Sequence, residues 1–221
     1  MNPYLRFDLD FILRHVPDFG PAILMTLGVF FTSLVAAFVG GVLLAIARQI
    51  RGPLCWAATV YIELMRNTPS LLHLFFVFFG LPLIGIVWSP FVCGVVALSA
   101  QHAAFLAEII RGAIQMLSRQ QREAGWALGL LPGKVMRYII LPQACRNSIP
   151  AVGNQSVLLL HDTALVSAIG IVEIMLTARS LAERSAASFE MFVTIGVIYL
   201  ALSSVLSLST GFLERYYAFE R

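Results

Sequence analysis

Long stretches without a charged residue set the first limit on how this 221-residue chain can fold. Residues 19–47 contain no Asp, Glu, Lys or Arg over 29 positions, and residues 191–213 contain none over 23 positions. A helix needs about 20 predominantly apolar residues to cross the hydrocarbon core of a bilayer. Each stretch therefore predicts one membrane-spanning helix. The first is longer than the 7–15-residue apolar core that is typical of a signal peptide, so we expect it to remain as a span.

Two further regions complete the set of expected spans. Residues 67–107 are uncharged over 41 positions, and the prolines and glycine within residues 82–90 predict a turn that divides them into two spans. Residues 143–172 are less apolar because they include Arg146 and Asp162, but their length fits one more span. The sequence thus predicts an all-α membrane protein with about five transmembrane helices.

The composition excludes several other classes of protein. Hydrophobic residues make up 59% of the chain and charged residues only 12%, whereas soluble domains are about one quarter charged. This balance rules out a water-soluble globular domain and a disordered chain. The basic residues are spread along the chain and form no nucleic-acid-binding patch, so the expected environment is a lipid bilayer and no nucleic-acid partner is expected. The three cysteines lie far apart without a C-x-x-C pair, and no metal site is expected.

Basic residues are unevenly divided between the two sides that a five-span chain defines. Eleven lie in residues 48–66, in residues 111–146 and in the C-terminal tail, against four on the other side, which are Arg6, Arg14, Arg179 and Arg184. Cytoplasmic loops carry the excess of Lys and Arg. The count therefore predicts a cytoplasmic C terminus and an N terminus outside. With only four spans, the basic segment 111–146 and the basic C-terminal tail would lie on opposite sides of the membrane. This favours the fifth span.

The longest expected cytoplasmic loop, about 111–142, has features of a folded element. Residues 123–129 predict a short helix, Gly129 can adopt the left-handed conformation that ends it, and Pro132 follows where a helix cannot easily continue. Apolar Trp126, Leu128, Leu130 and Leu131 lie in a loop that should meet water. Such a patch indicates either a docking surface for a partner or a helix lying on the membrane.

Residues 123–142 resemble the loop signature of ATP-binding-cassette (ABC) importer permeases, which reads EAA, three residues, G, nine residues, I-x-L-P. This chain has Glu123-Ala124-Gly125, Gly129, Ile139 and Leu141-Pro142, and only Gly125 departs, because Ala is usual there. The flanks are similar to the polar amino acid branch of the family, including residues 66–69, 107–112, 120–124, 141–144 and 161–165. The resemblance covers roughly residues 20–213.

This resemblance implies a type I ABC importer permease fold and a division of labour between subunits. It implies one transmembrane permease domain over residues 1–221, a second permease subunit, two ATP-binding subunits, an extracytoplasmic substrate-binding protein and a location in the bacterial inner membrane. The chain contains no GxxxxGK[ST] phosphate loop, so it is expected to be no enzyme and to hold no cofactor, with ATP and Mg on the ATPase partner. The implied ATPase-coupling residues are Glu123, Ala124, Gly125, Trp126, Leu128 and Gly129. From the residues alone, Glu123 could instead be a first-turn acid that favours the helix dipole.

Polar residues within the expected spans are candidates for the substrate path. Asp162 lies between apolar runs, where an acid is costly and often functional, although it could instead cap a short outer helix beside Thr163. Pro69 interrupts a helical pattern, and the result could be a broken helix that lines a cavity or an ordinary kink. Glu108 and Arg111 share a helical face and are expected to pair structurally. The candidate path residues are Asn67, Thr68, Gln101, Asn154, Gln155, His161, Asp162 and Thr163.

The substrate is the least constrained part of this interpretation. A carboxylate at Asp162 would favour a cationic amino acid by Coulomb attraction, whereas permeases for acidic amino acids in the family carry a similar Asp-Thr pair. The charge class and the choice between homodimer and heterodimer therefore stay open. A permease for another small polar solute is one alternative. A haem-binding membrane subunit that uses two of His73, His102 and His161 is another.

Overall fold

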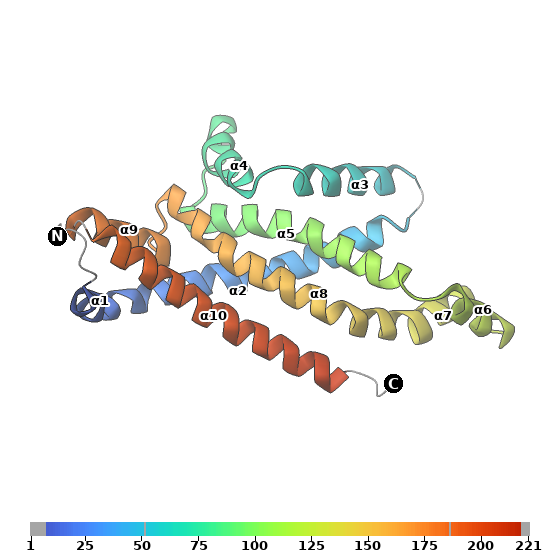
Figure 1. Ribbon diagram of the computed structural model, residues 1–221. Coiled ribbons are helices and arrows are strands. Elements are labelled where there is room, and N and C mark those ends of the chain that lie inside the picture. Colours follow the sequence, from blue (N-terminus) through green and yellow to red (C-terminus); the bar gives the residue numbers. More distant parts are fainter. Residues whose placement is uncertain (1–7, 51, 186, 218–221) are drawn as a thin grey trace. The chain divides into compact units, whose positions relative to one another are not determined.

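The computed structural model describes residues 8–50, 52–185 and 187–217, and within these ranges every regular element is a helix. This confirms the all-α prediction. Short 3₁₀ segments lie at Val16–Asp18, Leu81–Ile84 and Thr163–Ile169, and π-helical segments at Phe76–Gly80 and Met136–Ile140. Figure 1 follows the α-helices along the chain. They are α1 (Leu9–His15), α2 (Phe19–Ala47), α3 (Pro53–Arg66), α4 (Ser70–Phe75), α5 (Pro90–Gln115), α6 (Arg119–Ala127), α7 (Pro132–Val135), α8 (Leu141–Asp162), α9 (Ile174–Ser185) and α10 (Ser188–Tyr217).

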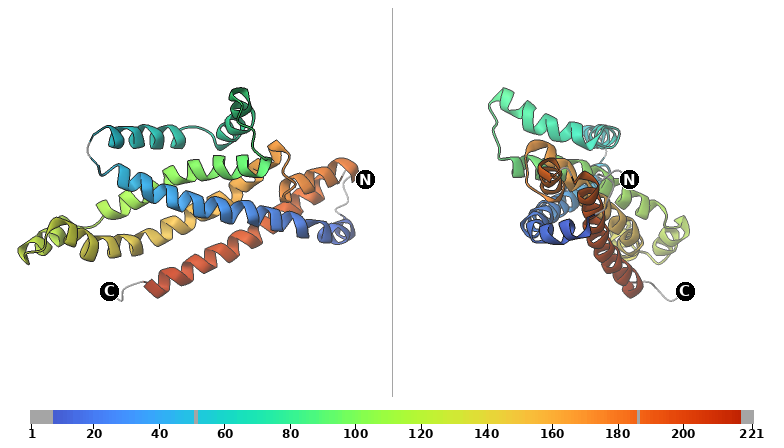
Figure 2. Two further views of the ribbon diagram at one scale, coloured as in Figure 1. Left: turned by 180° about the vertical axis from the view of Figure 1, so that it is seen from behind. Right: turned by 60° about the vertical axis from the view of Figure 1, so that its left-hand side comes forward.

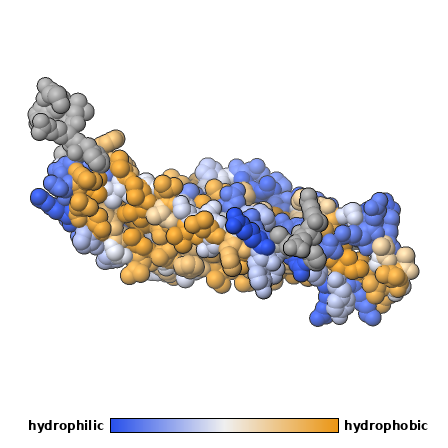
Figure 3. Space-filling view, turned by 60° about the horizontal axis from the view of Figure 1, so that its bottom comes forward, coloured by the Kyte–Doolittle hydropathy of each residue, from blue (hydrophilic) through white to orange (hydrophobic). Residues whose placement is uncertain are grey.

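The described ranges contain three helical stretches that are long and apolar enough to cross a membrane by themselves, Leu9–Ala47, Pro90–Gln115 and Ser188–Tyr217. Two interrupted pairs raise the number to five if each counts as one span; they are Pro53–Arg66 with Ser70–Ile84 and Pro132–Ile169 with Ile174–Ser185. The upper number equals the predicted one. On the face drawn in Figure 3, apolar residues form extended patches of the surface, as expected for contact with lipid.

The sides on which the termini lie stay a prediction, because length and composition do not fix orientation. Arg6, Arg51 and Arg221, which the count of basic residues includes, lie outside the described residues. The turn predicted within residues 82–90 is present, because the 3₁₀ segment ends at Ile84 and α5 begins at Pro90. The first half of residues 67–107 is not a span by itself, because Ser70–Ile84 is long and apolar enough only together with Pro53–Arg66, from which it is bent by 109°.

The treatment of residues 48–66 as a loop is wrong, because most of this segment forms α3. Pro53 occupies the first helical position, where its fixed φ suits a helix and its missing N–H is not needed. Ala58 and Ile62, four residues apart, form the buried face of α3. The helix ends at Arg66, so the basic residues here flank a packed helix.

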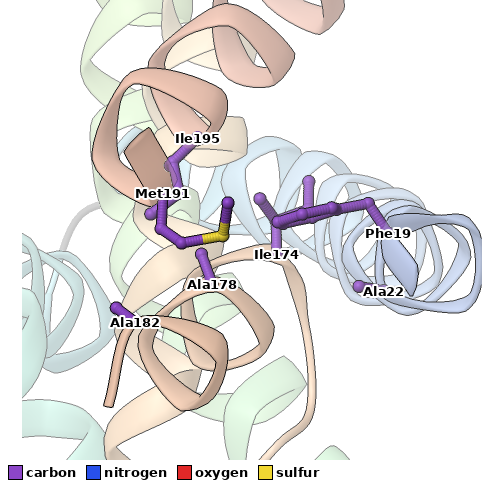
Figure 4. Packing of buried hydrophobic residues seen from close by; sticks show 7 residues of the cluster. All are labelled: Phe19, Ala22, Ile174, Ala178, Ala182, Met191 and Ile195. Carbon is purple, nitrogen blue, oxygen red and sulfur yellow. The ribbon is translucent and has the colours of Figure 1, made fainter. Parts of the chain in front are cut away.

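Contacts within the chain divide it into two compact units, and each of the long helices α2, α5, α8 and α10 contributes residues to both. The first unit consists of Met1–Leu34, Pro69–Leu98 and Leu158–Val205. Its core joins α2, α9 and α10 through side chains that Figure 4 shows pointing toward one another. On α9 the buried residues recur every fourth position, which is the spacing of one helical face. The core residues are Phe19, Ala22, Ile174, Ala178, Ala182, Met191 and Ile195.

The second unit consists of Val35–Thr68, Ser99–Val157 and Leu206–Arg221. One of its clusters joins Ala45 of α2, Ile62 of α3, and Ala104 and Ala107 of α5. Another connects the end of α5 to α7, the π segment and α8 through Ala113, Ile114, Val135, Ile140 and Ala144. Alanine supplies three of the four buried residues in the first of these clusters, which allows helix backbones to approach closely, as is common in membranes.

Candidate coupling surface and substrate path

The segment between α5 and α8 is folded rather than extended. Figures 1 and 2 show α6 and α7 lying together next to the ends of α5 and α8. Residues 111–115, expected to belong to the loop, continue α5 to Gln115. The connection that carries the candidate coupling residues therefore runs from residue 116 to residue 140, and it contains α6, α7 and a π-helical segment.

Gly129 ends α6 in the left-handed conformation that the sequence predicts, with φ of 77°. The Gly129 amide donates to the Trp126 carbonyl at 2.9 Å, and the Leu130 amide donates to the Gly125 carbonyl at 3.1 Å. These two bonds form a Schellman motif, which satisfies carbonyls that a helix end otherwise leaves unpaired. Pro132 then starts α7. The direction of the chain after α6 is thus fixed by local hydrogen bonds.

Gly125 is the position at which α6 packs against the following elements. It is buried, and a Cβ added there would lie 2.9 Å from Val135 Cγ2 and 3.0 Å from Ile139 Cδ1. Both distances are shorter than ordinary carbon contacts of about 3.5–4.0 Å. A residue without a side chain therefore fits this position. Because Val135 and Ile139 fill the space, even an alanine methyl group would require them to shift.

Apolar side chains on and after α6 are exposed. The exposed fractions are 49% for Trp126, 80% for Leu128 and 68% for Leu131. Leu130 instead packs partly buried against the cluster that includes Ile114 and Val135. The exposed side chains form an apolar surface on a folded, capped element, which we call the coupling surface (Trp126, Leu128 and Leu131).

The interpretation of Glu123 as a first-turn acid is wrong. α6 begins at Arg119 after Ser118, so Glu123 is the fifth helical residue. The residues between are Arg and Gln, which favour the helix and extend it toward the N terminus. The Glu123 carboxylate accepts a hydrogen bond from Arg119 Nε at 2.8 Å, and both side chains are exposed. Ala124 is exposed beside it.

The predicted pairing of Glu108 with Arg111 is confirmed and is part of a larger cluster. Arg111 donates from Nε at 3.0 Å and from Nη2 at 2.6 Å to Glu108 Oε2. Arg48 at the end of α2 also pairs with Glu108, and Arg66 Nη1 lies 3.8 Å from Oε2. One carboxylate thus connects three helices of the second unit.

Five of the candidate path residues belong to the second unit, and three of these form hydrogen bonds with its other elements. Gln101 Nε2 donates to the Thr68 carbonyl at 3.1 Å, and Gln155 Nε2 lies 2.7 Å from His102 Nδ1. Among the described residues, the buried Gln101 Oε1 has no hydrogen-bond partner. The remaining two, Asn67 and Asn154, are exposed.

The helix is broken rather than merely kinked at the Asn67-Thr68-Pro69 sequence. α3 ends at Arg66 and α4 begins at Ser70. The Asn67 amide side chain and the Thr68 hydroxyl donate to carbonyls at the end of α3, at 2.7 Å each. The break leaves the Thr68 carbonyl outside any helix, and this carbonyl accepts a hydrogen bond from Gln101 Nε2.

The other three candidate path residues belong to the first unit. Asp162 Oδ2 accepts a hydrogen bond from the Ser70 hydroxyl at 3.0 Å. Its side chain makes no capping bond to the 3₁₀ segment that follows, so the capping alternative is not formed. Thr163 is buried and donates to the Leu160 carbonyl at 2.6 Å, while His161 is exposed with its ring edge-on to Tyr199.

Glu173 is a buried acid that the sequence reasoning missed. Its side chain is fully buried, Oε1 accepts from the Leu176 amide at 2.9 Å, and Oε2 accepts from the Tyr199 hydroxyl at 3.1 Å. The signal was an acid between isoleucines and valines, the same pattern that drew attention to Asp162. Glu173 thus caps α9 and joins it to α10.

No group of three or more His, Cys, Asp or Glu residues that could hold a metal ion occurs in the part of the chain that the structure describes. The three histidines of the haem alternative are divided between the units. His73 and His161 belong to the first and His102 to the second, where His102 contacts Gln155.

Comparisons with known proteins bear directly on this arrangement. A family model described as the inner membrane component of binding-protein-dependent transport systems matches residues 37–218. The glutamine transport system permease protein GlnP of Escherichia coli (strain K12) is 33% identical over 96% of this chain and 98% of its own length. The arginine transport system permease protein ArtQ of Bacillus subtilis (strain 168) is 32% identical over 96% of this chain and 97% of its own length.

Solved structures support the same fold. A chain of the crystal structure of an amino acid ABC transporter with histidines superposes with a TM-score of 0.91 at 31% identity, covering 96% of this chain and all of that chain. A chain of the MetNI methionine ABC transporter in an inward-facing conformation gives a TM-score of 0.75 at 18% identity, over 95% of this chain and 97% of that chain, and this second likeness concerns the fold alone.

Proposed function

Because the chain belongs to the family of inner membrane components of binding-protein-dependent transport systems, we propose that it forms half of the gated path of an ATP-driven importer for polar amino acids. It is a transport permease subunit, and ATP hydrolysis in this family takes place on a separate subunit. Glutamine and arginine permeases among the relatives support an amino acid as substrate. Family membership leaves the haem-binding alternative without support.

The assembly that we propose contains this chain, a second identical or homologous permease subunit, two ATP-binding subunits that hold ATP and Mg, and an extracytoplasmic binding protein. We place it in the bacterial inner membrane, with the N terminus outside and the C terminus cytoplasmic. The two units of the chain together form one permease domain over residues 1–221, and the coupling loop projects into the cytoplasm.

The coupling surface is the observation that carries this proposal. Trp126, Leu128 and Leu131 expose apolar area that costs free energy in water, and a partner protein would bury it. The Schellman motif at Gly129 and the close packing at Gly125 make α6 a rigid element. A rigid element can transmit closure of an ATPase dimer to the spans as a rigid-body movement. Glu123 and Ala124 lie exposed on the same helix and complete the contact.

The polar side chains of the interrupted spans supply the substrate path in this proposal. Within the second unit, the Oε1 of Gln101, which has no hydrogen-bond partner among the described residues, offers an acceptor to a polar substrate, and within the first unit the carboxylate of Asp162 offers a negative charge. Non-helical backbone at membrane depth is tolerated where it is buried in protein or lines a water-filled cavity. The full proposed set is Asn67, Thr68, Gln101, Asn154, Gln155, His161, Asp162 and Thr163.

Reconstitution tests the function directly. The chain is co-expressed with a candidate ATPase and a candidate binding protein, the complex is placed in proteoliposomes, and uptake of labelled amino acids is measured with and without ATP. Thermal-shift screening of the binding protein against amino acids of each charge class identifies the substrate beforehand. ATP-dependent uptake of an amino acid supports the proposal. Uptake of a different small polar solute, with no amino acid bound or transported, contradicts the substrate assignment and leaves the permease role intact.

A further inference from the structure

An arginine-lined pocket of about 430 Å³ lies in the second unit and reaches α6. Arg48 directly after α2, Arg111 of α5 and Arg122 of α6 line it, and the lining residues in the described part of the chain include no acid. Gln49 and Thr59 add hydrogen-bonding groups. Pockets of roughly 300–1,000 Å³ are typical of small-molecule sites.

The positive charge of the three guanidinium groups is larger than the negative charge of the carboxylate that pairs with them. Among the described residues, Glu108 is the carboxylate that pairs with Arg48 and Arg111, and Arg111 Nη1 also donates to Gln115 Oε1 at 2.7 Å. Arg122 has no carboxylate partner there; its Nη2 donates to the Ile114 carbonyl at 3.1 Å. Its Nε is buried without a hydrogen-bond partner in the described chain. A buried N–H without a partner is costly, so an anion that accepts this bond would be stabilising.

We propose that this pocket binds a phosphate group, supplied by the headgroup of an anionic phospholipid. Arginine presents a planar fork of N–H donors that matches the oxygens of phosphate. The 29-residue apolar helix α2 ends at Ala47, one residue before Arg48, so the pocket lies where an apolar span gives way to polar chain. Basic pockets between membrane helices are sites at which lipid headgroups bind. Free phosphate shares this chemistry, and the experiment separates the two sources.

Occupation of the pocket would have a mechanical effect on the coupling helix. A phosphate held by Arg48, Arg111 and Arg122 would connect α2, α5 and α6 through one ligand. Arg122 is the only one of these residues that α6 contributes, and it already reaches back to the end of α5. The lipid would therefore hold α6 against the membrane end of the second unit.

Native mass spectrometry of the purified full-length chain measures this binding without any transport assay, so its result is independent of the proposed function. The protein is released from micelles that contain phosphatidylglycerol or phosphatidylcholine. We expect wild type to retain phosphatidylglycerol preferentially and Arg122→Gln to lower its apparent affinity about tenfold. Arg119→Gln is the matched control, because Arg119 makes the same charge change on α6 but is exposed and does not line the pocket. Glu108→Gln removes the carboxylate that offsets the arginines and should raise retention.

The source of the phosphate is decided by a second measurement on the delipidated protein. Thermal unfolding is followed after addition of inorganic phosphate or of phosphatidylglycerol. Stabilisation by the lipid, reduced in Arg122→Gln and unchanged in Arg119→Gln, supports the proposal. Stabilisation by inorganic phosphate alone overturns the lipid as the source. Equal retention of the two lipids, or equal loss in both arginine variants, overturns the site. Elution of Arg122→Gln as a single species with the wild-type helical signal in circular dichroism excludes misfolding as the cause of its loss.

Discussion

The hydroxyl of Ser70 donates a hydrogen bond of 3.0 Å to Oδ2 of Asp162, although 92 positions separate the two residues in the chain. Ser70 is the first residue of α4, directly after the helix break, and Asp162 is the last residue of α8. The contact therefore joins the start of α4 to the end of α8. The bond thus holds the Asp162 carboxylate, at the end of an interrupted span, beside the helix break that precedes α4.

Replacement of Asp162 tests its proposed place in the path. We expect Asp162→Ala to lower transport and substrate-stimulated ATPase activity per assembled complex. Asp162→Asn keeps an oxygen that can accept from Ser70, so it should retain more activity if hydrogen bonding is the role, and no more than Ala if the charge is required. Ser70→Ala serves as the control that removes the donor and leaves the carboxylate. Full activity of Asp162→Ala, normalised to intact complex, would remove this residue from the path.

Replacement of Gly129 tests the coupling helix. Gly129→Asp places a Cβ at a φ of 77°, which costs about 1–2 kcal/mol, and puts a charge beside the apolar coupling surface. We expect transport to be uncoupled from ATP hydrolysis while the protein stays in the membrane. Gly133→Asp is the matched control, because Gly133 is also exposed and open in space but has no left-handed conformation to satisfy. Normal transport by the Gly129 variant in its complex would contradict the docking assignment.

Variants of the exposed pair Arg119 and Glu123 distinguish an effect on stability from an effect on contact with the ATPase. Their side chains are 87% and 50% exposed, and exposed pairs spaced four residues apart on a helix contribute only about 0.3–0.5 kcal/mol. Both Arg119→Ala and Glu123→Ala should therefore leave the thermal unfolding temperature almost unchanged. If Glu123 contacts the ATPase, only Glu123→Ala lowers the affinity measured between the permease and its ATPase. A similar loss in both variants would assign the effect to the ion pair.

Local chemistry could be predicted from the sequence, and long-range pairing could not. The cap at Gly129 was predictable because a glycine that ends a helical pattern, followed closely by proline, depends only on neighbouring residues. The 29-residue helix α2 follows in the same way from one uncharged run. Pro69 alone indicated an interruption of the helix, but it did not decide between a break and a kink. By contrast, nothing within residues 161–163 specifies Ser70 as the partner of Asp162, because that contact arises from tertiary packing.

The two errors at helix starts have identifiable causes. Residues 48–66 were assigned to a loop on their charge, but arginines at both ends flank an apolar, helix-forming stretch that begins at Pro53. The start of α6 was placed too late because the family signature begins at Glu123, whereas Ser118 supplies a residue type common at helix starts five positions earlier. Glu173 was overlooked because it carries no signature, and its importance depends on Tyr199 from another helix.

Reporter fusions test the proposed orientation. With eleven basic residues on one side against four on the other, a reporter fused after Arg221 should be cytoplasmic. A reporter inserted at residue 182, in α9, should be extracytoplasmic. Alkaline phosphatase, active only outside the cytoplasm, and a fluorescent protein that folds in the cytoplasm give opposite signals at each position. An external C terminus would exclude five spans with the N terminus outside.

Removal of Glu108 tests the ion-pair cluster at the end of α5. Its side chain is 14% exposed and connects Arg48, Arg111 and Arg66, so Glu108→Gln leaves part-buried guanidinium groups without their carboxylate. Breaking a buried pair from one side costs about 3–5 kcal/mol, and partial exposure should reduce the loss here to about 2 kcal/mol. Glu183→Gln is the control, because Glu183 pairs with Arg179 where both side chains are more than 60% exposed, and it should cost less than about 0.5 kcal/mol. The difference is measured as the shift in thermal unfolding temperature in one detergent and at one salt concentration. Equal shifts for the two variants would mean that the Glu108 cluster is screened by solvent and does not stabilise the second unit.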